Sequence, residues 1–326
     1  MNPEYRTCPL TGRIVILAPE RAARPVALQH FAPHHRDALG GSFCPFCVGN
    51  EWDTPETKFE VRDGAGWQLR VVANKFPAVN ETLRAATVTE RDGANRSLTD
   101  AARHAFGHHE VVIECREHVS DPTQLTPQQL ANVFIACRER TTALMSLSEI
   151  RSVAVFRNVG AEAGASLPHA HSQILATPFV PEALKRELDG ARLLPSVFES
   201  MVNDESRRVA RSDRFAVVCP FAPRFAYEMW LLPVTPQPRF EAVTDAECRE
   251  LAGLLQRVLG ALDRVQSRPA YNWVLHSAPT DDTTFRWHLE VLPRLNRAAG
   301  FEWSTGVFIN AVPPEVAAAQ LCGEYH

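Results

Sequence analysis

The chain has 326 residues, of which 45% are hydrophobic and 22% charged, and this is the composition of a globular protein with a sizeable core. The net charge of −4 and the lack of a long basic run argue against a nucleic-acid partner. The sequence contains no run of about 18 apolar residues, the length needed to cross a membrane. Its N-terminus lacks the apolar core of a signal peptide, and its eight cysteines do not form a disulfide pattern. We therefore expect a cytoplasmic protein whose cysteines are thiols or metal ligands.

The first 60 residues are rich in proline, histidine and arginine, and only Ile14–Leu17 has the pattern of a strand. We expect a long arm after this strand. It carries Arg21 and Arg24, which could form a solvated basic patch, and the sequence Cys44-Pro45-Phe46-Cys47. A single C-x-x-C could be a redox pair, half of a zinc site or a coincidence. Zinc needs four ligands, so a zinc site here would take two ligands from elsewhere.

The most informative stretch runs from Phe156 to Pro178. A strand leads into a loop that contains two glycines, and the loop is followed by His169-Ala170-His171-Ser172-Gln173 and a second apolar run. Alternate residues of a strand share a face, so both histidines and the glutamine could point the same way. Backbone N–H groups in such a loop attract anions, and a neutral imidazole held by its other nitrogen is a competent nucleophile. The pattern favours a phosphate site over one core histidine and one surface histidine.

Two capping boxes reveal an internal repeat. Thr126–Gln129 and Thr244–Glu247 each precede an apolar helical stripe, and they lie 118 residues apart. An offset of 117 to 118 residues also carries the strand at Val111 onto Met229, and His171 onto His288. We expect a strand–helix–strand–strand unit that is used twice.

The stretch GASLPHAHSQ resembles the active-site signature of the galactose-1-phosphate uridylyltransferase family, a branch of the histidine-triad superfamily. RAARP at Arg21–Pro25, CPFC at Cys44–Cys47 and the region of His118 also match, and the likeness runs from Arg6 to about Val312. Together with the repeat, it implies an α+β fold. Two histidine-triad-like halves, 1–185 and 186–326, would form one mostly antiparallel sheet with helices packed against it.

The resemblance implies a structural zinc ion and a homodimer. His118 and His169 would complete the zinc site with Cys44 and Cys47, and zinc on His169 would tie the arm to the catalytic strand. The arm that carries Arg21 and Arg24 would reach a nucleotide's phosphates, often across a subunit boundary, where planar bidentate donors suit phosphate.

The resemblance also implies nucleotidyl transfer through a covalent intermediate. His171 would attack the α-phosphorus of a nucleoside diphosphate sugar, and a sugar phosphate or inorganic phosphate would then attack nucleotidyl-His171. The backbone carbonyl of His169 would hold the other ring nitrogen of His171. The supporting residues would be Ser166 on the departing phosphate, Gln173 and the N–H groups of Gly164, Ala165 and Ser166 on the transferred phosphoryl group, Asn74 in the base and ribose pocket, and Asn158 on the ribose or a phosphate.

Gln173 separates this chain from histidine-triad hydrolases, which carry histidine at that position. An amide donates a hydrogen bond but shuttles no proton. The intermediate should therefore resist water, which favours a transferase over a hydrolase.

The second half has lost this chemistry, because HAHSQ becomes Arg286-Trp287-His288-Leu289-Glu290 there. We expect this half to be mainly a scaffold. Some uridylyltransferases bind a second metal, and the matching positions are Glu187, His276, His288 and Glu290. The last is glutamate where those enzymes have histidine, so this chain departs from the pattern.

The sequence leaves the substrate open. Ala165 stands where uridylyltransferases often have cysteine, and Asn310 stands about where they use a glutamate to grip the hexose hydroxyls. Both features look more like the ADP-glucose phosphorylase branch, but the second C-x-x-C of that branch is missing from Ala191–Asn203. We expect a UDP-glucose:hexose-1-phosphate uridylyltransferase-like enzyme. The alternatives, in order, are an ADP-glucose phosphorylase, a nucleotide hydrolase of the histidine-triad type, and a non-enzymatic zinc-stabilised nucleotide-binding module.

Overall fold

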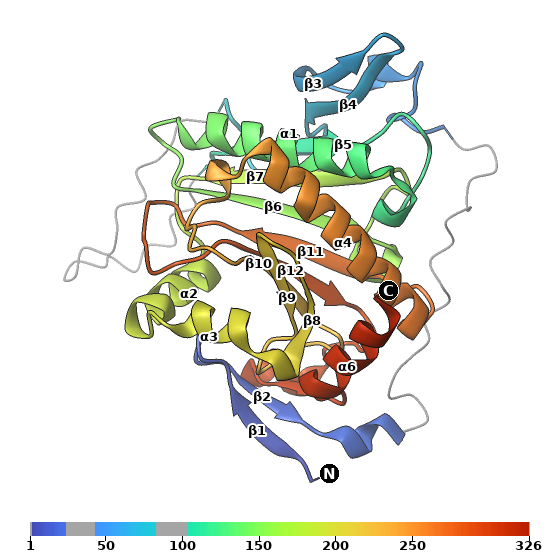
Figure 1. The fold of residues 1–326 in the computed structure, drawn as a ribbon. Coiled ribbons are helices and arrows are strands. Elements are labelled where there is room, and N and C mark those ends of the chain that lie inside the picture. The colour runs from blue at the N-terminus through green and yellow to red at the C-terminus, as the bar shows by residue number, and fades with distance from the viewer. Residues whose placement is uncertain (1, 24–42, 83–103, 326) are drawn as a thin grey trace.

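The computed structural model describes residues 2–23, 43–82 and 104–325, and its centre is one ten-stranded sheet (Figure 1). The strand order is β3-β4-β5-β7-β6-β11-β12-β10-β9-β8, and all neighbouring strands are antiparallel. A small sheet of order β1-β2-β13 lies apart from it. The strands are β1 Glu4–Thr7, β2 Ile14–Leu17, β3 Thr57–Asp63, β4 Gly66–Ala73, β5 His108–Ile113, β6 Ser152–Val159, β7 His171–Thr177, β8 Arg208–Arg211, β9 Phe215–Val218, β10 Met229–Pro233, β11 Tyr271–His276, β12 His288–Pro293 and β13 Phe308–Asn310.

The duplicated unit is present. β5, helix α1 (Pro127–Met145), β6 and β7 recur as β10, helix α4 (Asp245–Gln266), β11 and β12. Both helices begin at the expected capping boxes, in which the hydroxyl of Thr126 or Thr244 accepts from the backbone three residues on. The two copies meet where β6 pairs with β11.

The predicted fold class is therefore confirmed. The expected division between residues 185 and 186 falls inside helix α2 (Glu182–Leu193), and two halves with that boundary remain a proposal.

Helices α1 and α4 lie side by side over one face of the large sheet (Figure 1). β10 shows how the two faces divide, because Met229 and Leu231 join the core under these helices whereas Trp230 and Leu232 join a second core on the opposite face. That second core belongs to α2, helix α3 (Val197–Asn203) and the β1–β2 hairpin. Both faces of the second half are thus covered.

The first half is covered differently. On the face opposite α1, β4 and β5 contribute only a small apolar cluster in the described residues, made of Trp67, Val72, Val111 and Ile113 with Phe46 packed on it. The rest of this face is left for polar side chains, and β7 presents His171 and Gln173 there. Two further helices complete the fold, α5 (Gly300–Thr305) and α6 (Pro314–Glu324). None of the helices in the described ranges has the length and apolar character that a bilayer span requires.

Candidate active site and metal cluster

Four side chains that are far apart in the sequence form one cluster of metal-binding groups. Cys44, Cys47, His118 and His169 bring their ligand atoms within 4.8 Å of one another. Sγ of Cys47 lies 3.0 Å from Nδ1 of His118 and 3.7 Å from Nδ1 of His169, and Sγ of Cys44 lies 3.6 Å from the latter. Tetrahedral zinc places sulfur and nitrogen ligands about 3.5 Å apart. These residues therefore fit a Cys₂His₂ site.

The surroundings of the cluster also suit a cation. Nε2 of His169 donates to the carbonyl of Cys115 at 3.0 Å, which leaves Nδ1 as the ligand atom. Burial lowers the pKa of His169 to about 4, so its imidazole is neutral. Burial, together with the neighbouring Cys44, raises the pKa of the Cys47 thiol to about 11. A bound divalent cation would reverse that second shift, because metal ligation requires thiolate.

His169 lies just before β7, which starts at His171. The expectation that both histidines share one strand face was therefore wrong in detail. The break between them lets His169 turn toward the cysteines, whereas His171 and Gln173 face the pocket.

His171 is held in one tautomer. Its Nδ1 lies 2.7 Å from the carbonyl oxygen of His169, and because a carbonyl only accepts, the ring proton sits on Nδ1 and the lone pair on Nε2. Burial lowers the pKa of His171; the hydrogen bond to His169 offsets part of this, and the charge of Arg157 adds to the lowering. The result is a neutral imidazole with a nucleophilic nitrogen.

His171 lines a cavity of about 390 Å³ together with Gln173, Ser166 and Asn74. Phe46 from the C-x-x-C turn forms part of the wall, and its ring meets that of His171 edge-on at 5.5 Å. Three strands, the metal-cluster turn and the loop before β7 thus converge on one concave, largely apolar site, the usual form of a small-ligand pocket.

The glycine loop before β7 contains a short turn. Gly164 adopts a left-handed conformation with φ of +86° that ends a short turn. Its N–H donates to Ala161, and that of Ala165 donates to Gly160. Those two N–H groups bond within the turn itself, whereas the side chain of Ser166 lines the pocket. The substrate roles of Gly164 and Ala165 stay predictions.

Asn158 lies beside this loop at the joint between the two halves. Its Oδ1 accepts from Nδ2 of Asn272 on β11 at 2.8 Å, and the same Nδ2 donates to the carbonyl of Ala163 at 2.8 Å. Arg294 holds Asn272 in turn, with Nε 2.6 Å from Oδ1. The second half therefore fixes the glycine loop of the first, a contribution that the sequence did not reveal.

A buried ion pair lies behind β7. Glu114 and Arg157 are almost inaccessible to solvent and pair directly, and Ser172, which follows His171, donates to Glu114. Arg157 also reaches the carbonyl of Ser120 at 3.2 Å. This group joins β5, β6 and β7 to the loop after His118. Neither residue was singled out in the sequence, although a charged residue within an apolar strand pattern is the signal that would have found each.

Arg21 and Asn310 do not reach the pocket of their own chain. Asn310 pairs with Leu17 in the small sheet, and the 3₁₀ turn that carries Arg21, Pro19–Ala23, follows that strand. The small sheet lies at the opposite end of the molecule from β4, β5 and β7 (Figure 1). Asn310 is fully buried, with Nδ2 donating to Pro223 and Oδ1 accepting from Val312. Arg24 lies outside the described residues, and the substrate roles of all three remain predictions.

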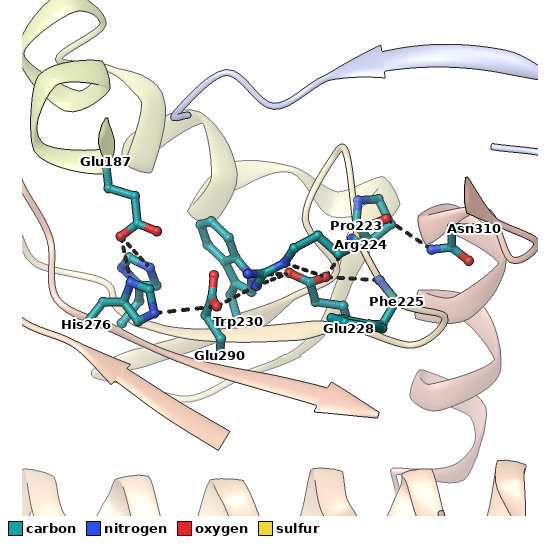
Figure 2. Close-up of polar contacts among 10 residues, drawn as sticks. Glu187, Pro223, Arg224, Phe225, Glu228, Trp230, His276, Glu290 and Asn310 are labelled. Carbon is teal, nitrogen blue, oxygen red and sulfur yellow. Dashed lines mark hydrogen bonds and ion pairs between the residues drawn. The ribbon is translucent and has the colours of Figure 1, made fainter. Parts of the chain in front are cut away.

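The second predicted metal position is also a cluster, on the covered face of the second half (Figure 2). Glu187, His276 and His288 bring ligand atoms together, and Nε2 of His288 is buried without a hydrogen-bond partner. Burial would lower the pKa of His276, but Glu187 and Glu290 outweigh it and raise it to about 9. Figure 2 shows Glu290 between His276 and Arg224. Nη2 of Arg224 donates to Oε2 of Glu290 at 2.5 Å. Three of the four positions therefore fit a metal, and the fourth is engaged by an arginine.

His288 repeats the geometry of His171 without its cavity. Its Nδ1 donates to the carbonyl of Arg286 at 3.0 Å, as His171 does to His169. However, Trp230 stacks on its ring at 4.7 Å and Phe198 and Phe285 pack around it. The second copy thus keeps the strand, but the ring of its histidine is inaccessible to solvent.

The duplicated sheet and the H-x-H-x-Q strand define a tandem histidine-triad-like protein. Residues 61–324 match the family described as a domain of unknown function (DUF4921). ADP-glucose phosphorylase of Arabidopsis thaliana is 32% identical over 327 residues, covering 96% of this chain and 91% of the relative. Galactose-1-phosphate uridylyltransferase of Thermotoga maritima is 28% identical, covering 98% and 97%.

A solved structure agrees with these relatives. The crystal structure of an ADP-glucose phosphorylase from Arabidopsis thaliana with bound ADP-glucose has a TM-score of 0.85 at 30% identity, covering 99% of this chain and 98% of that one. The chain belongs to the galactose-1-phosphate uridylyltransferase family, which includes the ADP-glucose phosphorylase branch.

Proposed function

We propose that this protein is a nucleotidyltransferase that acts on nucleoside diphosphate sugars through a covalent nucleotidyl-His171 intermediate. The observation that carries the proposal is the His171 ring. Its Nδ1–H is fixed on the carbonyl of His169, so its Nε2 lone pair is available in a cavity that also holds Gln173 and Ser166.

The reaction would proceed in two displacements. Nε2 of His171 attacks the α-phosphorus, the bond to the sugar 1-phosphate breaks, and Ser166 donates a hydrogen bond to that leaving group. An oxygen of a second phosphate then attacks the same phosphorus, and the phosphorus–nitrogen bond breaks. Donors aimed at the transferring phosphoryl group provide most of the stabilisation in such reactions, and Gln173 is placed for this role.

Two substrate pairs follow from the relatives. UDP-glucose with a hexose 1-phosphate is the pair of the uridylyltransferases. ADP-glucose with inorganic phosphate is supported by the higher identity and cover of the Arabidopsis enzyme. A panel of UDP- and ADP-sugars with either acceptor decides between them.

The covalent intermediate gives the sharpest test. A nucleoside diphosphate sugar labelled at the α-phosphate should leave its label on the wild-type protein and none on His171→Gly. His108→Ala, which changes a neighbouring histidine bound to Glu81, is the control that should keep the label. Steady turnover with water as the only acceptor would favour the hydrolase, and label on neither protein would contradict nucleotidyl transfer.

We also propose that Cys44, Cys47, His118 and His169 hold a structural zinc ion. Bound there, zinc would fix the turn that carries Phe46 and the backbone carbonyl that orients His171. We expect Cys47→Ser to lose one equivalent of zinc and to unfold at a lower temperature, whereas Cys322→Ser, at an exposed position, should retain both properties. The Glu187 cluster is a candidate for a second ion, and metal in excess of one equivalent that is lost in His276→Ala would assign it.

We propose a homodimer in which Arg21 and Arg24 act on the partner's pocket, since Arg21 lies far from the pocket of its own chain. Mixing an Arg21→Ala/Arg24→Ala variant with His171→Gly tests this. Activity that reappears in the mixture supports shared sites, and a mixture as inactive as its components contradicts them.

A further inference from the structure

His109 lies beside the pocket and has no role in the proposed chemistry so far. It is on β5, where Val111 is the direct partner of Gln173 on β7. Residues two apart in a strand share a face, so His109 is the diagonal neighbour of Gln173 on the pocket side. Its ring is half-buried and makes contacts on both nitrogens.

These contacts fix the position of the ring proton. The backbone N–H of Ala78 donates to Nδ1 of His109 at 3.0 Å. A main-chain amide can only donate, so Nδ1 is an acceptor and the proton of the imidazole is on Nε2. Asn74 Nδ2 lies 3.2 Å from Nε2, and with the proton on Nε2 that contact is packing between two donors, not a hydrogen bond.

The ring proton in turn fixes the amide of Gln173. Oε1 of Gln173 lies 2.9 Å from Nε2 of His109 and accepts its proton. A reversed amide would set its NH₂ group against the Nε2–H, which already faces the NH₂ group of Asn74, and would leave that proton without an acceptor among these contacts. The NH₂ group of Gln173 is therefore the part of the side chain directed away from His109, and Gln173 lines the same cavity as His171.

We propose that His109 is a positioning residue that keeps Gln173 oriented as a hydrogen-bond donor to the transferring phosphoryl group. This inference rests on the proposed function. A reversed Gln173 would present its carbonyl oxygen to a phosphate oxygen, and two acceptors repel. Because either orientation of an amide has nearly the same shape, packing alone cannot choose between them.

His109 also holds the opposite wall of the pocket. Its carbonyl accepts from the N–H of Asn74 at 2.8 Å, and its ring accepts from Ala78, so both ends of the segment Asn74–Ala78 are attached to it. Asn74, Lys75 and Phe76 of that segment line the cavity. Without the ring, the segment Asn74–Ala78 should be held less firmly, which should raise KM. The side-chain amide of Gln173 should also be free to reverse, which should lower kcat.

A double-mutant cycle separates these two effects. We expect His109→Phe, which keeps a ring of similar size, to lower kcat by about 10- to 100-fold, less than the roughly 100- to 1,000-fold cost of removing such a donor outright. If His109 acts on kcat through Gln173, then His109→Phe/Gln173→Ala should be no slower than Gln173→Ala. Losses that multiply in the double variant would overturn the proposal. The matched control is His108→Ala, whose histidine contacts Glu81, and it should keep wild-type kinetics.

A partial restoration adds a second check. In His109→Gln, the side-chain NH₂ can still donate to Gln173, but the contact with Ala78 is lost. We expect kcat to recover and KM to stay raised. Recovery of KM without kcat would contradict the assignment.

The tautomer can be measured without any activity. Nitrogen NMR of the His109 ring should show a protonated Nε2 and an unprotonated Nδ1 in the wild-type protein. A proton on Nδ1 would overturn the proposal whatever the enzyme does. Failure of the proposed function appears separately, as the absence of label on wild-type His171.

Discussion

At the scale of single residues, burial controls the protonation state of His171. His171 is buried except for its side toward the cavity, and its pKa is depressed chiefly for that reason. The hydrogen bond to His169 then decides which nitrogen keeps the lone pair. In the proposed reaction, His171 would therefore need no added base to act as a nucleophile, because its imidazole is already neutral.

This predicts a particular pH dependence. A histidine with a depressed pKa becomes protonated only when the pH falls below the ordinary histidine range, so the rate of label transfer to His171 should be flat around neutrality. Between about pH 8 and about pH 5, it should fall only on the acid side of about 6.5, the ordinary pKa of histidine. Single-turnover labelling across this range, at saturating donor, is the measurement. A midpoint above the ordinary pKa of histidine would be incompatible with burial as the dominant influence.

The buried pair behind His171 predicts a stability effect. Arg157→Met leaves the carboxylate of Glu114 in the core without its cation, so we expect a loss of about 3–5 kcal/mol in the free energy of unfolding. Glu114→Leu/Arg157→Met removes both charges and should recover much of it. Denaturant titration measures both variants, with Arg62→Met in an exposed pair as the control. Equal losses in Arg157→Met and the double variant would argue against an uncompensated charge as the cause.

At the scale of elements, the glycine loop depends on a strand from the other half. Asn272 on β11 holds both Asn158 and the carbonyl of Ala163. We expect Asn272→Ala to slow label transfer by about tenfold, since unsatisfied buried polar groups cost about 1–3 kcal/mol. Quenched-flow labelling measures the rate. The control is Asn203→Ala, on the surface of α3, which should keep the wild-type rate. An unchanged rate in Asn272→Ala would leave the second half as a scaffold only.

Elements with local signals were predictable from the sequence. The capping boxes placed α1 and α4, and the constant offset between them identified the duplicated unit. The cysteine pair and the two histidines were assigned correctly as one cluster by resemblance to the family. Features that depend on pairing across the sheet were not predictable: the contact of His109 with Gln173 needs the β5–β7 register, and that of Asn272 with Asn158 needs β6 beside β11. The N–H groups of Gly164 and Ala165 bond to carbonyls of their own turn, and only the backbone geometry of the turn reveals these hydrogen bonds.

The whole molecule shares one core across the duplication. The cluster under α1 and α4 contains residues from both copies, such as Phe134 and Trp273, whose rings lie 6.1 Å apart. Strands β6 and β11 are paired through five positions. Neither copy could therefore lose its structure and leave the other intact.

We accordingly predict a single unfolding transition. Calorimetric and van't Hoff enthalpies should agree, because the two copies share their central strand pair and their main core. Scanning calorimetry of the zinc-loaded protein is the measurement. Two resolved transitions, or a calorimetric enthalpy well above the van't Hoff value, would contradict one cooperative unit.

The stacking of Trp230 on His288 has a consequence for stoichiometry. His171 and His288 each donate from Nδ1 to a backbone carbonyl, but aromatic rings cover His288, so only His171 can react with a donor. A rapid mix with excess donor should therefore release an initial burst of one leaving group per polypeptide, so the amplitude of that burst counts correctly folded pockets.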